Sequence, residues 1–107
     1  MTLEELTRVV REFAAEREWG RFHTPKNLAM AVASEAGELL AEFQWLTAQE
    51  QPEISAVAEE MADVLIYLVR LADVLDVDLL VAAEAKIAAN RQRYTVERSR
   101  GNARKVR

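Results

Sequence analysis

The strongest constraint on the fold is that this sequence reads as helix almost throughout. No segment alternates apolar and polar residues as a β-strand does, whereas apolar residues recur every three or four positions. Both prolines, and most of the few glycines, lie where helices would begin or end. The sequence therefore predicts an all-α protein.

Capping signals divide the chain into four predicted helices. Thr2 with Glu5 forms a capping box, Thr24 precedes Pro25 at a first helical position, and Asp78 can cap the last helix. The predicted helices span about residues 2–18, 25–45, 52–75 and 78–94, with a loop at Trp19–Thr24 and a further capping signal, Thr47 with Glu50, between the second and third. Their predicted inward residues are Leu3, Leu6, Val10, Phe13, Leu28, Val32, Ala36, Leu39, Phe43, Val57, Met61, Val64, Leu65, Leu68 and Ala72.

Short connections predict that these helices pack as antiparallel neighbours in a four-helix bundle. With 107 residues, the chain is expected to form one domain, residues 1–107. A domain of this size buries a modest core, so we expect it to associate with further copies of itself.

Composition excludes several classes of protein. The chain has no cysteine, which excludes disulfides and thiolate metal sites. No apolar run reaches the roughly 18 residues needed to span a membrane, and the acidic, amphipathic N-terminus is unlike a signal peptide, so we expect a cytoplasmic protein without a membrane partner. Residues 1–94 carry a net charge of −8 and the basic tail, residues 95–107, carries +4. An acidic body repels polyanions, so stable nucleic-acid binding is not expected.

Two pairs of carboxylates stand in unusually apolar surroundings. Glu35 and Glu38 lie within LAMAVASEAGELLAEF, Glu60 directly precedes MADVLIYLV, and Asp63 lies within it. The i, i+3 spacing places each pair on one helix face. If the two helices pack antiparallel, four carboxylates converge, and a divalent cation would relieve their repulsion. All-oxygen ligands favour Mg²⁺, with Mn²⁺ as a substitute.

Alternatively, these acids are ordinary solvated residues of a helix surface, as Glu4, Glu5, Glu12, Glu16 and Glu84 are expected to be. A single Glu-x-x-Glu pair is weak support for a metal site. Two such pairs, each in an apolar segment, favour the metal site. Gly37 between the two glutamates predicts close packing there, because a glycine inside a helix is otherwise unfavourable.

The run EAGELLAEFQW at residues 35–45, followed by EMADVLIY at residues 60–67, resembles the MazG-like, all-α nucleotide pyrophosphohydrolase superfamily. Within it, the chain is most similar to the dCTP pyrophosphatases. The resemblance extends to REFAAEREW, FHTPKNL, KIAANRQRY and SRGNARKV, and so covers nearly the whole chain.

The resemblance implies a bundle of the all-α NTP pyrophosphatase type that assembles as a homodimer or homotetramer. It also implies an Mg²⁺-dependent enzyme that splits a nucleoside triphosphate into a monophosphate and pyrophosphate, in nucleotide-pool housecleaning. It makes Glu35, Glu38, Glu60 and Asp63 the metal ligands, with Glu35 or Glu38 also a catalytic base, and ranks Glu59 outside this set. The substrate-binding residues that it implies are Trp19, Gly20, Arg21, Phe22, His23, Trp45, Tyr67, Lys86, Asn90 and Tyr94.

Several alternatives stay open. Trp19 and Trp45 are either walls of a base pocket or core residues, since tryptophan at a helix end usually packs in a core. Several dCTP-specific relatives carry a histidine where this sequence has Val10, so the substrate is dCTP, a modified dCTP, dUTP or another non-standard nucleotide. A different class of function is a non-catalytic helical dimerisation or nucleic-acid-binding module.

Overall fold

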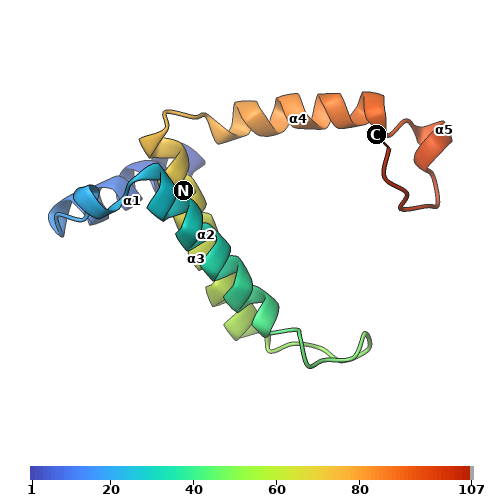
Figure 1. Ribbon diagram of the computed structural model, residues 1–107, viewed down its shortest axis with the longest axis horizontal. Helices are drawn as coiled ribbons and strands as arrows, with labels where there is room; N and C mark the ends of the chain where they lie inside the picture. The colour runs from blue at the N-terminus through green and yellow to red at the C-terminus, as the bar shows by residue number, and fades with distance from the viewer. Residues whose placement is uncertain (107) are drawn as a thin grey trace. The chain divides into compact units, whose positions relative to one another are not determined.

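The structure, a computed structural model, describes residues 1–106 of the chain. Its regular secondary structure is entirely helical within that range, which confirms the predicted all-α class. The elements are α1 (Leu3–Glu16), the 3₁₀-helix η1 (Gly20–Phe22), α2 (Pro25–Ala41), α3 (Ile54–Val74), α4 (Leu79–Arg93) and α5 (Val96–Ser99) (Figure 1).

Three of the four predicted helix starts are confirmed by their caps, whereas α3 begins at Ile54 rather than at Pro52. At Thr2, Thr24 and Asp78, a side-chain oxygen accepts a hydrogen bond from a backbone N–H of the first turn, at 3.1–3.2 Å. Each such cap stabilises its helix by about 0.5–2 kcal/mol.

The predicted end of the second helix is wrong by four residues. α2 ends at Ala41 rather than Trp45. Beyond it the N–H of Phe43 bonds to the carbonyl of Leu40, an i to i−3 bond that tightens the chain out of α-helical geometry. Trp45 therefore lies in the connection between α2 and α3.

Residues 1–76 form one compact unit. In it α2 and α3 lie side by side and antiparallel, joined at one end by residues 42–53, and α1 packs against α3 (Figure 1). The buried apolar residues are Ala14, Leu28, Val57, Val69 and Ala72, which confirms Leu28, Val57 and Ala72 as core residues.

Other predicted core positions are exposed. Apolar side chains of these helices also lie at positions that no neighbouring helix of the unit covers. The predictions that are wrong for this reason are Phe13, Ala36, Phe43, Met61, Leu65 and Leu68. The predictions that are half-buried are Leu3, Leu6, Val10, Val32, Leu39 and Val64.

Residues 77–106 form a second unit, containing α4 and α5. The basic tail has more structure than the sequence predicted, because the side chain of Thr95 accepts a bond from the N–H of Arg98 and begins α5. Arg107, the last residue of the tail, lies outside the described residues. The four-helix bundle and the single domain spanning 1–107 stay predictions.

None of the helices in residues 1–106 has both the length and the apolar character that a membrane crossing requires.

Candidate functional site

The packing of α2 against α3 brings three of the four predicted metal ligands together. Glu35 and Glu38 come from α2 and Glu60 comes from α3. One carboxylate oxygen of each lies within 4.8 Å of the other two. The i, i+3 spacing and the antiparallel packing therefore produce the predicted convergence of carboxylates.

Two of these carboxyl groups each have one oxygen without a hydrogen-bond partner. Glu35 Oε2 and Glu60 Oε2 are buried, and neither has a hydrogen-bond partner among the described residues. Burial raises the pKa of Glu35, and a hydrogen bond to Glu38 raises that pKa further. Burial likewise raises the pKa of Glu60, with the charge of Glu38 as the next cause. Buried carboxylate oxygens without donors destabilise the charged form unless a cation approaches them.

Three other acids surround this group. Asp63, one turn after Glu60, contributes a negative charge that raises the pKa of both Glu35 and Glu60. Its role as the fourth ligand stays a prediction. Glu42 also raises the pKa of Glu60, although the sequence interpretation did not include it. Glu59 is exposed, whereas Glu60 is half-buried.

This donor set fits a divalent cation. It is all-oxygen, it concentrates negative charge, and it contains two buried oxygens without donors. The prediction of close packing at Gly37 is wrong within residues 1–106, because a Cβ built there would meet no atom within 4 Å. The glycine lies between the two glutamates of α2 at a point that neighbouring side chains leave open.

A backbone motif positions the predicted substrate loop, residues 19–23. α1 ends in a Schellman motif, in which the N–H of Trp19 bonds to Ala14 O at 2.9 Å and that of Glu18 to Ala15 O at 3.0 Å. Glu18 adopts φ 55°, the left-handed conformation usually taken by glycine. The reversal places the edge of the Trp19 ring against Phe13, with ring centroids 5.7 Å apart.

The rest of the loop is a single 3₁₀ turn, Gly20–Phe22, followed by His23. Asn27 Nδ2 donates a hydrogen bond to Phe22 O at 3.0 Å, and the rings of Trp19 and His23 meet edge to face at 6.2 Å. Trp19 and Phe22 stay partly exposed, and Gly20 and Arg21 are exposed. The loop is therefore anchored at both ends and presents aromatic side chains to solvent.

An ion-pair network that the sequence interpretation missed fastens α1 to α3 beside this loop. Arg11 donates two hydrogen bonds to Asp73, from Nε at 2.9 Å and from a terminal nitrogen at 2.6 Å. Arg70 donates to the same carboxylate at 3.1 Å and to His23 Nδ1 at 3.0 Å. The Asp73 side chain is only 14% exposed, so its charge depends on these partners.

We expect Asp73→Asn to lower the free energy of unfolding by about 1–3 kcal/mol at pH 7, the usual cost of losing one partner of a charged hydrogen-bonded pair. Hydrogen bonds from Arg11 hold the pKa of Asp73 below its ordinary value of 3.8. The stabilisation is therefore complete above about pH 4 and is lost as the pH falls through the lowered pKa. Urea unfolding at pH 7, 5 and 2, at fixed protein concentration, measures it. The free energies of unfolding of Asp73→Asn and the wild type should converge at low pH. Glu59→Gln, at an exposed position, is the control variant. A constant difference at all three pH values would contradict the ionic origin.

Trp45 lies far from the substrate loop within one chain. The loop precedes the first residue of α2, and Trp45 follows its last turn. A helix of 17 residues is about 25 Å long. Trp45 is 87% exposed, so the alternative that it fills a core is wrong within residues 1–106. The predicted aromatic residues therefore do not form one wall in one copy of the chain.

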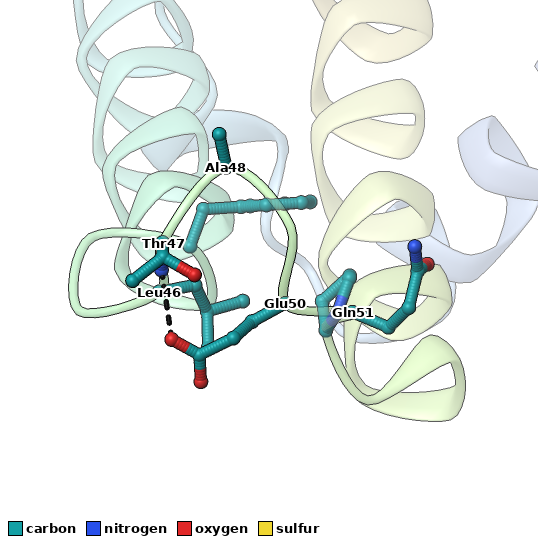
Figure 2. Close-up of a pocket in the computed structure, with 7 residues that line it drawn as sticks. Leu46, Thr47, Ala48, Glu50 and Gln51 are labelled. Atoms are coloured by element: carbon teal, nitrogen blue, oxygen red, sulfur yellow. Dashed lines mark hydrogen bonds between the residues drawn. The ribbon is translucent and has the colours of Figure 1, made fainter.

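A shallow cavity of about 350 Å³ occupies the connection that contains Trp45, without Trp45 in its lining (Figure 2). Glu50 Oε1 accepts a hydrogen bond from the N–H of Thr47 at 3.0 Å, and the N–H of Glu50 donates back to Thr47 O, so the two residues of the predicted capping signal form a turn. The lining residues are Phe43, Leu46, Thr47, Ala48, Glu50, Gln51 and Pro52.

The remaining predicted substrate residues divide between the two units. Tyr67 lies one turn after Asp63 on α3 and is half-buried. Lys86 and Asn90 share one face of α4, and Tyr94 ends that helix. These three belong to the second unit, and their role at the substrate stays a prediction.

Comparison with known proteins assigns the family. Residues 30–107 match the MazG-like family. The chain belongs to the MazG-like family. Among similar MazG-like proteins, dCTP pyrophosphatase 1 of Rattus norvegicus is 50% identical over 95% of this chain, and dCTP pyrophosphatase 1 of Homo sapiens is 46% identical over 97%.

A solved structure agrees with the fold. The crystal structure of a pyrophosphatase from Archaeoglobus fulgidus is 40% identical, with a TM-score of 0.82 over 86% of this chain and 91% of that one. The chain spans 64–65% of the length of the rat and human relatives, which therefore contain further sequence.

Proposed function

We propose that this chain is an Mg²⁺-dependent nucleoside triphosphate pyrophosphohydrolase, which converts a (d)NTP and water to a (d)NMP and pyrophosphate. The observation that carries the proposal is the convergence of Glu35, Glu38 and Glu60, with two buried oxygens that no donor satisfies. Similarity to proteins named dCTP pyrophosphatase 1, and to a solved pyrophosphatase, supports the same activity.

The acids would hold the metal and the loop would hold the nucleoside. Glu35, Glu38, Glu60 and Asp63 are the proposed ligands of Mg²⁺, for which Mn²⁺ is a chemically similar substitute. A divalent cation held by these acids would supply positive charge to the phosphates and would make a water more acidic. Glu38, the exposed member of the three, is positioned to accept a proton from an attacking water, with Glu35 as the alternative base.

The proposed substrate is dCTP or a modified dCTP, and the cellular purpose is removal of unwanted nucleotides. Val10 favours a second candidate, the same reaction on dUTP or another non-standard nucleotide, because an aliphatic side chain offers no hydrogen bond to a base. Tyr67, Lys86, Asn90 and Tyr94 are proposed to bind the sugar and phosphates, since they carry the donors that such oxygens require.

We also propose that the enzyme is a homodimer or homotetramer whose base pocket is completed by a neighbouring copy. Two observations support this. Within residues 1–106 the buried apolar core consists of five residues, while α3 exposes Met61, Leu65 and Ile66. Trp45 and the loop 19–23 lie at opposite ends of α2, so one base can contact both only if they come from different copies.

We expect dCTP to yield dCMP and pyrophosphate in equal amounts, with dCDP and phosphate absent, and only when Mg²⁺ or Mn²⁺ is supplied. The reason is that the proposed site grips the phosphates through metal-binding acids and has no serine or cysteine nucleophile paired with a base. Chromatography of a panel that includes dCTP, 5-methyl-dCTP, dUTP and dTTP, with and without chelator, measures the products.

Detection of dCDP as the first product would contradict the reaction type. An absence of turnover for every nucleotide, combined with salt-dependent binding to DNA or RNA, would instead favour the non-catalytic module.

A further inference from the structure

Arg70 is a nearly buried charge that the proposed reaction does not use. It lies on α3, and its side chain is 12% exposed. Its Nε donates to His23 Nδ1 at 3.0 Å, and a terminal nitrogen donates to Asp73 at 3.1 Å. A guanidinium placed in this way joins the substrate loop to the ion-pair network of α1 and α3.

The contact with Arg70 fixes the protonation state and the tautomer of the His23 ring. A guanidinium only donates hydrogen bonds, so the Nδ1 that faces it must be an acceptor without a proton. The neutral ring then carries its proton on Nε2. A second proton would place an N–H against the guanidinium. Burial lowers the pKa of His23, and the charge of Arg70 lowers that pKa further.

Arg70 is itself held in place. Asp73, one turn later on α3, accepts from Arg70 and also receives two hydrogen bonds from Arg11 of α1. The loop is anchored independently by the bond from Asn27 to Phe22 O. The imidazole therefore has a fixed neighbour at Nδ1 and a loop backbone that keeps it there.

We propose that Arg70 is a positioning residue for substrate recognition, which holds His23 so that Nε2–H is a fixed hydrogen-bond donor to an acceptor atom of the nucleotide. The inference rests on the proposed function. A fixed donor favours ligands that offer an acceptor and disfavours those that leave it unpaired. Because His23 belongs to the substrate loop and not to the acidic group, its contact should contribute to binding rather than to the chemical step.

A pH titration of His23 in the absence of nucleotide tests whether Arg70 contacts this imidazole and controls its pKa. His23 is the only histidine of the chain, so its imidazole resonances are unambiguous in NMR spectra. We expect Arg70→Met to raise the pKa of His23, because the loss of a positive neighbour also leaves the charge of Asp73 less compensated. Exposed Arg8→Met, the control, should titrate as the wild type does. Identical titrations of Arg70→Met and the wild type would overturn the proposal.

A double-mutant cycle tests the consequence for the substrate. Arg70→Met and His23→Ala should each raise KM for the best nucleotide about threefold to tenfold, the effect of one hydrogen bond, with kcat within about twofold. The double variant should be no worse than His23→Ala alone, because Arg70 acts through His23. If the increases in KM of the two single variants multiply in the double variant, Arg70 has a merely structural role and the proposal is overturned.

Arg70→Lys is a second variant, which keeps the proposal testable if Arg70→Met folds poorly. It keeps the charge beside Asp73 and one donor, so it should retain the fold and an intermediate KM if Arg70→Met is poorly folded. A lysine variant with the KM of the methionine variant and a wild-type circular dichroism spectrum would count against the positioning role. If the wild type turns over no nucleotide, the proposed function fails and the nucleotide contact fails with it. The titration would still decide separately whether Arg70 controls His23.

Discussion

Glu38→Ala and Asp63→Ala should each lower kcat by about a thousandfold or more. A metal ion in such a site supplies several kcal/mol of charge stabilisation in the transition state, and each 1.4 kcal/mol is a factor of ten in rate. A carboxylate oxygen of Glu38 lies within 4.8 Å of one from Glu35 and one from Glu60, and its charge raises the pKa of both. Its removal should therefore abolish activity without destabilising the metal-free fold.

Three measurements test this prediction on the same samples. Pyrophosphate release at saturating Mg²⁺ gives kcat, circular dichroism gives the helical content, and a thermal melt in chelator gives the melting temperature. Glu59→Ala is the matched control, because Glu59 is exposed and adjacent to Glu60. We expect the control to keep wild-type turnover. Near wild-type rates in Glu38→Ala would refute the metal-site assignment.

The acidic site was predictable because its signal is local. Glu35 and Glu38 are charged residues in a segment that is otherwise nearly apolar, and a helix places residues three apart on one face. Antiparallel packing of α2 against α3 was predicted from a short connection between the two helices, although the connection in the structure spans residues 42–53. The sequence also contained a signal for Glu42, seven residues after Glu35 and therefore on the same helix face, which the interpretation did not use.

The network around Arg70 was not predictable in the same way. Arg70 and His23 are 47 residues apart, and Arg11 and Asp73 are 62 apart. Each appears in the sequence as an ordinary polar residue of a helix or loop, without unusual surroundings. Only the fold shows that Arg70 is nearly buried and that its one uncharged partner is the single histidine.

The exposed core positions show a second limit of sequence patterns. Apolar periodicity identifies which face of a helix avoids water, but it does not say what covers that face. Met61 and Leu65 of α3 follow the pattern correctly and are nevertheless 57% and 44% exposed in this chain. Trp45 is 87% exposed, which is more than either of these residues. It lies outside any helix, and no side chain within residues 1–106 covers it.

Trp45→Ala should raise KM about tenfold to a hundredfold and change thermal stability little. Stacking of an aromatic ring on a base is worth about 1–3 kcal/mol, and 1.4 kcal/mol is tenfold in affinity. Because Trp45 is 87% exposed, its truncation creates no cavity, and surface changes usually alter stability by about 0.5 kcal/mol or less. Ile54→Ala, 67% exposed at the start of α3, controls for the loss of exposed apolar surface. An unchanged KM with a large loss of stability would exclude stacking.

Mixing two defective variants should restore activity if neighbouring copies complete the pocket. In a mixed oligomer of Glu38→Ala and Trp45→Ala chains, one composite site receives intact acids from one chain and an intact tryptophan from the other, while the opposite site receives both defects. The length of α2, about 25 Å, makes this arrangement necessary for any base that contacts both Trp45 and the loop 19–23. Co-unfolding and refolding an equal mixture should therefore give kcat/KM well above the mean of the two separate variants. Activity equal to that mean, in a sample shown by native mass spectrometry to contain mixed oligomers, would place the whole pocket within one chain.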